Sequence, residues 1–156
     1  MNKKVDKKYY IIAVALTLIA TMLMVPITNA ITTTWAQSVV DSSNVTNPQN
    51  ILGTSPDGNY ARFNPTETKL IVKLKTSPST PVRPGIYAHT TSGTVRVYMY
   101  MTYDCNGPWV PAGYVDVGTT PGMYWSNGAA PGNICGISIN LPTGVYLYVD
   151  YVAFQY

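Results

Sequence analysis

The chain has 156 residues, enough for one domain of ordinary size. Its formal charge of +3 comes from a lysine-rich start, because six basic and six acidic side chains balance each other from residue 31 onward. This neutral body argues against an electrostatic nucleic-acid binder, so we expect no nucleic acid among its partners. The glycines, prolines and tyrosines gathered there favour short strands joined by turns over long helices.

Residues 1–30 have the pattern of a secretory signal peptide. Met1–Tyr10 is basic, Ile11–Ile27 is an apolar run, and Thr28–Ala30 supplies the small residues that a signal peptidase reads. We therefore expect cleavage after Ala30 and a secreted protein that is extracellular or attached to the cell surface. The alternative is an uncleaved membrane anchor, because the apolar run approaches the length that spans a bilayer.

The body, residues 31–156, is expected to be a single all-β domain. Strand signals recur every ten to fifteen residues between Gly, Pro and Asn, which is typical of an antiparallel β-sandwich or barrel. The final strand is apolar or aromatic on both faces and is therefore expected to be central in its sheet. A hairpin connection, Pro142–Gly144, is expected before it. The expected strands are Leu70–Leu74, Gly85–His89, Thr94–Thr102, Val110–Val117, Ile134–Leu141 and Val145–Tyr151.

The strand at Thr94–Thr102 shows the clearest alternation of the chain. Val95, Val97, Met99 and Met101 fall on one face, and Arg96, Tyr98 and Tyr100 fall on the other. The first set is expected to enter the core, which leaves the second set on the outside.

Two short patterns indicate covalent modification of an exported chain. Cys105 and Cys135 are the only cysteines, and an even pair in an oxidising compartment predicts a disulfide. Asn44 begins the sequence Asn-Val-Thr, which is an acceptor for N-linked glycosylation.

The segment before the first clear strand carries the most specific pattern. Asn47-Pro48 starts a turn, Gly53 permits a positive φ, and Pro56-Asp57-Gly58 is a tight turn followed by Tyr60. This order resembles the opening of secreted discoidin-like, or galactose-binding-like, jelly-roll modules. Such modules commonly end in a strand with an Asp followed by apolar residues, as Asp150 is here. One departure is that Thr54-Ser55 adds a residue before Pro56.

The resemblance implies an antiparallel β-sandwich of the jelly-roll type that binds carbohydrate or a cell-surface glycan, often with a structural calcium. Calcium takes six to eight oxygen ligands. The candidate ligands are Asp57 and Asp150, with Asp41 and Asn47 as helpers. Aromatic rings stack on sugars while polar groups donate hydrogen bonds, so the candidate carbohydrate-binding residues are Arg96, Tyr98, Tyr100, Trp109 and Trp125.

An enzyme is not expected, because no nucleophile, metalloprotease or phosphate-loop motif is present and the single histidine, His89, has no catalytic setting. A second hypothesis is a structural subunit of an extracellular filament or surface coat. After cleavage, the β-prone arm of residues 31–36 would add as a strand to the next copy of the chain.

Overall fold

The computed structural model describes residues 31–75 and 80–156, and strands form most of this part of the chain. Ile31–Tyr156 is one compact unit. Among the described residues, no helix is long and apolar enough to cross a membrane. The elements are β1 (Thr33–Ser43), β2 (Val45–Thr46), the 3-10 turn η1 (Pro48–Ile51), β3 (Ala61–Phe63), β4 (Glu67–Leu74), β5 (Arg83–Thr90), β6 (Val95–Thr102), β7 (Val110–Val117), β8 (Gly122–Trp125), β9 (Ile134–Asn140) and β10 (Leu147–Gln155).

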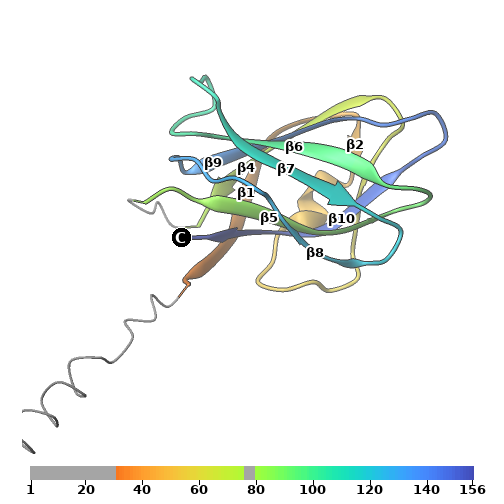
Figure 1. Cartoon of the computed structure of the whole chain (residues 1–156), viewed down its shortest axis with the longest axis horizontal. Helices are drawn as coiled ribbons and strands as arrows, with labels where there is room; N and C mark the ends of the chain where they lie inside the picture. Colours follow the sequence, from red (N-terminus) through yellow and green to blue (C-terminus); the bar gives the residue numbers. More distant parts are fainter. Residues whose placement is uncertain (1–30, 76–79) are drawn as a thin grey trace, which may run out of the picture. The chain divides into compact units, whose positions relative to one another are not determined.

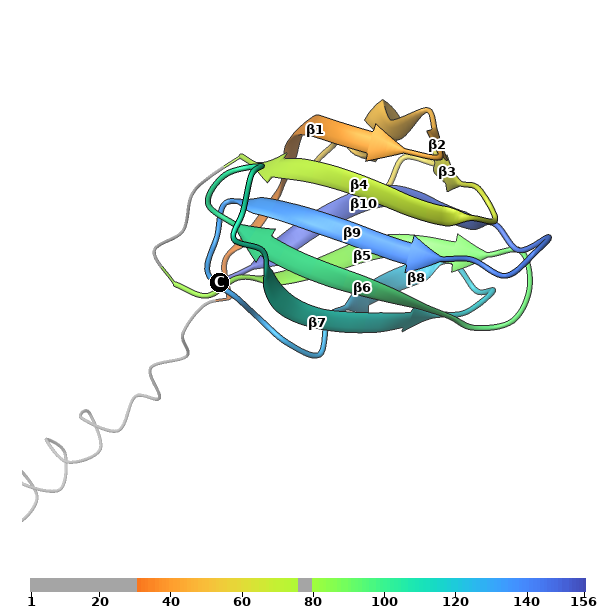
Figure 2. The ribbon, with the colours of Figure 1, turned by 90° about the horizontal axis from the view of Figure 1, so that it is seen from above.

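Two antiparallel sheets lie face to face in a β-sandwich, which Figure 1 shows from the edge. The sheet called B here has the order β1-β4-β9-β6-β7 and forms the nearer layer in Figure 2. In the sheet called A, β10 pairs with β5 on one side and with β3 and the start of β1 on the other, while β8 follows β5. The expected central position of the last strand is therefore confirmed.

The first strand belongs to both sheets. Thr33–Trp35 pair with β10 in sheet A, and from Ala36 onward the strand pairs with β4 in sheet B. Two register shifts along β1 bend it from one layer to the other. The N-terminal arm that the filament hypothesis requires to be free is thus paired within its own domain, where Thr32 and Tyr156 also exchange backbone hydrogen bonds of 3.1 Å.

Alternation along each strand builds the core between the sheets. In β6, Val95, Val97, Met99 and Met101 are all buried, while Arg96 and Tyr98 are exposed, so the predicted faces are confirmed. The largest fully buried side chains of the described residues include Phe63, Phe154, Ile51, Leu70, Leu74, Ile86, Ile137, Ile139 and Leu147.

The predicted disulfide is not present in the structure. Cys135 lies on the inner face of β9 with no exposed surface, whereas Cys105 is exposed in the loop between β6 and β7, and both thiols are free. Because the core packs around Cys135, burial raises the pKa of its thiol to about 12. An even cysteine count was therefore a misleading signal for a bond.

The connection at Pro142–Gly144 also differs from the expectation. It contains a turn, since the Val145 N–H donates to the Pro142 carbonyl at 3.1 Å. The strands on either side belong to different sheets, however, because β9 pairs within sheet B and β10 within sheet A. The connection therefore crosses between layers and is not a hairpin.

The signal-peptide prediction concerns residues 1–30, which lie outside the described residues.

Candidate functional site

The outer face of sheet B carries a groove with a volume of about 890 Å³. This lies within the range of about 300–1,000 Å³ that is common for small-molecule sites. Its floor spans four neighbouring strands, and its far wall comes from the loop between β6 and β7. The lining residues are Asp41, Ser43, Asn44, Thr66, Glu67, Thr68, Lys69, Ile71, Tyr100, Cys105, Asn106, Trp109, Gly136, Ile137 and Ser138.

The strand register explains why these side chains meet. One row across the sheet runs from Asp41 through Ile71 and Gly136 to Tyr100, which are successive partners in the ladders of β1, β4, β9 and β6. The next row runs from Ser43 through Lys69 and Ser138 to Tyr98. Residues two apart in a strand share a face, so both rows point outward.

Trp109 lies over the one position of the first row that has no side chain. A Cβ placed on Gly136 would come within 2.9 Å of Cζ3 and 3.2 Å of Cη2 of Trp109. The six-membered part of the indole therefore lies against the backbone of β9, beside Tyr100. A glycine within a strand often marks such a close approach, and this signal in the sequence could have indicated the site.

A tight turn holds the loop that carries Trp109. The carboxylate of Asp104 accepts the Asn106 N–H at 2.9 Å, and the Asp104 carbonyl accepts the Gly107 N–H at 3.4 Å. Gly107 has a φ of 92°, which only a residue without a side chain adopts at low cost. Local hydrogen bonds thus fix the approach of Trp109 to the sheet.

An ion pair occupies one wall of the groove. Asp41 accepts a hydrogen bond from the Lys69 ammonium group at 2.7 Å, and both side chains are about half exposed. Hydrogen bonding and charge attraction from Lys69 hold the pKa of Asp41 below its usual value. Asp41, which was expected as a helper ligand for calcium, lies in this groove instead.

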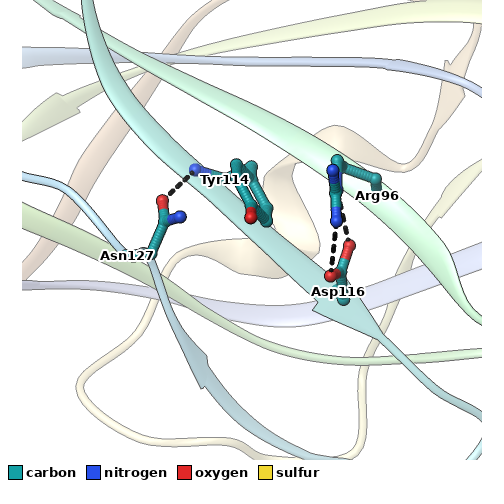
Figure 3. Close-up of polar contacts among 4 residues, drawn as sticks. All are labelled: Arg96, Tyr114, Asp116 and Asn127. Carbon is teal, nitrogen blue, oxygen red and sulfur yellow. Dashed lines mark hydrogen bonds and ion pairs between the residues drawn. The ribbon is translucent and has the colours of Figure 1, made fainter.

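Arg96 and Tyr98 lie on the same face of sheet B, beyond the groove lining. The Arg96 guanidinium donates two hydrogen bonds to Asp116, at 2.8 and 2.9 Å, and its central carbon lies 3.9 Å from the centre of the Tyr114 ring (Figure 3). Asp116 raises the pKa of Arg96, and Arg96 lowers that of Asp116. The guanidinium is therefore committed to partners within the sheet.

Asn127 covers part of the outer edge of sheet B next to this cluster. Its side-chain oxygen accepts the backbone N–H of Tyr114 at 3.0 Å, as Figure 3 shows. The backbone N–H of Asn127 donates to the Tyr114 carbonyl at 3.1 Å. The groups of β7 that a further strand would need at this position are thus already paired.

Trp125 lies on the opposite side of the molecule from the groove. It belongs to β8 in sheet A, opposite Gly85 of β5, and a Cβ on Gly85 would meet its ring at 2.5 Å. Since Ile86, the next residue, points into the core, Gly85 and Trp125 face outward. Of the five predicted carbohydrate-binding residues, the structure brings only Tyr100 and Trp109 together in the groove.

The predicted pairing of Asp57 and Asp150 is present, although not in the form that a shared calcium requires. Asp150 is buried, and its two carboxylate oxygens accept the backbone N–H groups of Asp57 and Gly58 at 3.0 and 2.8 Å. The carboxylate of Asp57 accepts the N–H and side-chain amide of Asn59 at 2.9 and 3.0 Å, and these bonds lower its pKa. Each of the four oxygens already accepts one N–H group, and only these two carboxylates of the described residues meet here, whereas calcium takes six to eight oxygen ligands.

No group of three or more His, Cys, Asp or Glu side chains suited to a metal occurs in residues 31–75 and 80–156. Asn47 precedes η1 in a left-handed conformation with a φ of 53°, and its carbonyl accepts the Asn50 N–H at 3.1 Å. Asn44 has a φ of 57°, and its side-chain amide donates to the Glu67 carbonyl at 2.9 Å. Asn44 is exposed at the groove, and its glycosylation remains a prediction.

His89 forms part of an aromatic cluster on sheet A. Its ring stacks on Tyr148 with centroids 5.2 Å apart, and Tyr60 meets it edge-on at 5.0 Å. Burial and then the charge of Asp150 raise the pKa of Tyr60. A packing role therefore accounts for this histidine.

The sequence matches no model of a known protein family and no curated protein. Solved structures do resemble the fold. The CBM32 of AlyQ in complex with 4,5-unsaturated mannuronic acid aligns with a TM-score of 0.56 and 10% identity, covering 78% of this chain and 96% of that one. A pectin-binding carbohydrate-binding module aligns with a TM-score of 0.52 and 8% identity, covering 76% and 89%.

A truncated AlyQ with CBM32 and alginate lyase domains aligns with a TM-score of 0.54 and 10% identity, and covers 81% of this chain but only 34% of its own. These likenesses show the fold alone: it is a β-sandwich that these carbohydrate-binding modules share, in agreement with the galactose-binding-like jelly roll that the turn pattern of residues 47–60 predicted.

Proposed function

We propose that the chain is a non-catalytic carbohydrate-binding module and that the groove on sheet B holds a segment of a glycan. The observation that carries this proposal is the Trp109 ring, whose six-membered part lies against Gly136 beside Tyr100 within an open groove. Four strands about 4.8 Å apart give the floor a width of about 14 Å, enough for a short oligosaccharide.

The chemistry of the lining suits a sugar. The C–H groups on the face of a pyranose pack on the electron-rich face of an aromatic ring, while its hydroxyls need directed donors and acceptors. Ser138, Asn106 and the Asp41–Lys69 pair supply such groups around Trp109. The same fold in two carbohydrate-binding modules is consistent with this function.

The setting that we propose is outside the cell, as the leader of residues 1–30 predicts. The filament hypothesis has less support, because the segment that would join the next copy is paired with β10 of its own domain.

Binding to a panel of soluble polysaccharides, measured by affinity electrophoresis and calorimetry, tests the proposal. Trp109→Ala removes the stacking surface and is expected to weaken binding at least tenfold, since burial of an aromatic face contributes about 1.5–3 kcal/mol. Gly136→Ala keeps the tryptophan but forces its ring away from β9, so we expect a similar loss.

Trp125→Ala is the matched control, because it removes the same type of residue from above a glycine on the other sheet. We expect it to leave the affinity unchanged. Equal losses in the Trp109 and Trp125 variants, or wild-type binding to none of the polysaccharides, would refute the groove as a glycan site.

A further inference from the structure

The charges within the groove are few and unequal. Among its lining residues, Asp41 and Glu67 are acidic and Lys69 is the one basic side chain. The groove therefore carries one excess negative charge when all three are ionised, although the body of the protein is neutral.

The single cation of the lining already has a partner. Lys69 lies 2.7 Å from Asp41, and the lowered pKa of that carboxyl keeps it ionised at neutral pH. A sugar carboxylate that attracted Lys69 would leave Asp41 without its partner in the same groove. The net charge of the groove that the ligand meets is thus the same whether Lys69 pairs with Asp41 or with the sugar carboxylate.

Glu67 adds a second negative charge to the lining. Within residues 31–75 and 80–156, no basic side chain lies within ion-pair distance of its carboxylate. Its backbone carbonyl accepts the Asn44 side-chain amide, which positions the strand but leaves the side chain exposed.

The other cations on this face lie outside the groove lining. Arg96 is held by Asp116 through two hydrogen bonds and by the Tyr114 ring. Lys73 lies further along β4, two residues beyond Ile71 and outside the lining.

From these charges we infer that the groove selects uncharged sugars and rejects uronates. This inference rests on the proposed function and deepens it, because it names the class of glycan. Neutral hydroxyls can accept from Lys69 and donate to Asp41 or Glu67, whereas a sugar carboxylate can only accept and would be repelled by both acids.

The test compares neutral hexose oligosaccharides, each beside its counterpart oxidised at C6 to the uronate, by calorimetry on the full protein. We expect the neutral form to bind at least tenfold more tightly at low salt. High salt should narrow this ratio by strengthening uronate binding, because it screens repulsion between exposed charges.

Charge-removing variants locate the cause. Asp41→Asn releases Lys69, and Glu67→Gln removes the unbalanced charge, so each should lower the ratio of neutral to uronate affinity several-fold. The ratio within one variant is the readout, so a general loss of affinity does not affect it. Asp57→Asn makes the same change of charge in the turn beside β10 and should leave the ratio unaltered.

The possible outcomes separate the two proposals. Uronates that bind as tightly as neutral sugars, or a ratio that neither groove variant moves, would overturn the charge selection and leave the glycan site standing. Binding of neither class would overturn the proposed function and, with it, the selection.

Discussion

Asp150 is predicted to be the polar side chain on which the opening loop depends most. It is only 3% exposed and lies at a register shift of β10, between Val149 and Tyr151, which turns its carboxylate toward the loop. Both of its oxygens accept backbone N–H groups, from Asp57 and Gly58. Asp150→Ala would leave those two donors without acceptors in a partly buried place.

The expected magnitude follows from the two lost bonds. An unsatisfied buried donor costs about 1–3 kcal/mol. Water can reach these partly buried amides, and removal of a buried charge offsets part of the loss, so we expect the free energy of unfolding to fall by about 2–4 kcal/mol. For a body of this size that corresponds to a drop in Tm of about 8–16 °C.

Thermal and urea unfolding of the variant measure this loss. The matched control is Asp57→Ala, because that carboxylate is exposed and accepts its two hydrogen bonds from Asn59 in its own turn. We expect the control to lower stability by less than about 1 kcal/mol. A variant of Asp150 that melts with the wild type, or two variants of equal effect, would contradict the assigned role.

Calcium distinguishes the observed arrangement from the metal site that the sequence suggested. Because only two carboxylates of the described residues meet here and both already accept N–H groups, whereas calcium takes six to eight oxygen ligands, wild-type melting curves with calcium and with chelator should coincide. A native-state ligand at a hundredfold excess over its Kd would stabilise by about 2.7 kcal/mol. A rise in Tm with calcium would therefore restore the metal hypothesis.

Three further predictions concern the cysteines and the leader. A thiol reagent should label Cys105 in the native protein and Cys135 only after unfolding, and no labelling after unfolding would show that the disulfide exists after all. Burial raises the pKa of the Cys135 thiol from 9.0 to about 12. The buried thiol therefore contributes fully to stability below pH 9, and this contribution is lost as the pH rises toward 12. In urea unfolding, Cys135→Ala should make the fall of the free energy of unfolding with alkaline pH shallower, and an unchanged pH dependence would contradict this prediction. Mass spectrometry of the exported protein should find Ile31 as its first residue, whereas Met1 in a membrane fraction would support an anchor.

The strands that alternate strongly could be predicted from the sequence. The expected strand Val110–Val117 matches β7, and the expected faces of β6 are those observed. Alternation of apolar and polar residues follows from burial of one face, so a strand with one buried face can be recognised in the sequence. The turn pattern that includes Pro56-Asp57-Gly58 likewise predicted the galactose-binding-like sandwich.

The polar strand β1 could not be predicted in the same way. It lies at the edge of sheet B, changes sheets, and has two register shifts, so no period of two survives along Thr33–Ser43. The groove depends on this strand, because β1 brings Asp41 beside Lys69. Site residues that become neighbours only through the pairing of distant strands are invisible to local pattern.

The same pairing gives the groove its rigidity. Its floor is fixed by the ladders of β4 with β9 and of β9 with β6, which place Ile71, Gly136 and Tyr100 in one row. A slip of one residue in either ladder would turn Gly136 toward the core and remove the surface on which Trp109 lies. The position of the Trp109 ring is therefore fixed in the absence of a ligand, so the proposed binding would cost little ordering of this side chain. In the proposed function, selection among sugars then depends on the charges of Asp41, Glu67 and Lys69, which are exposed in this groove.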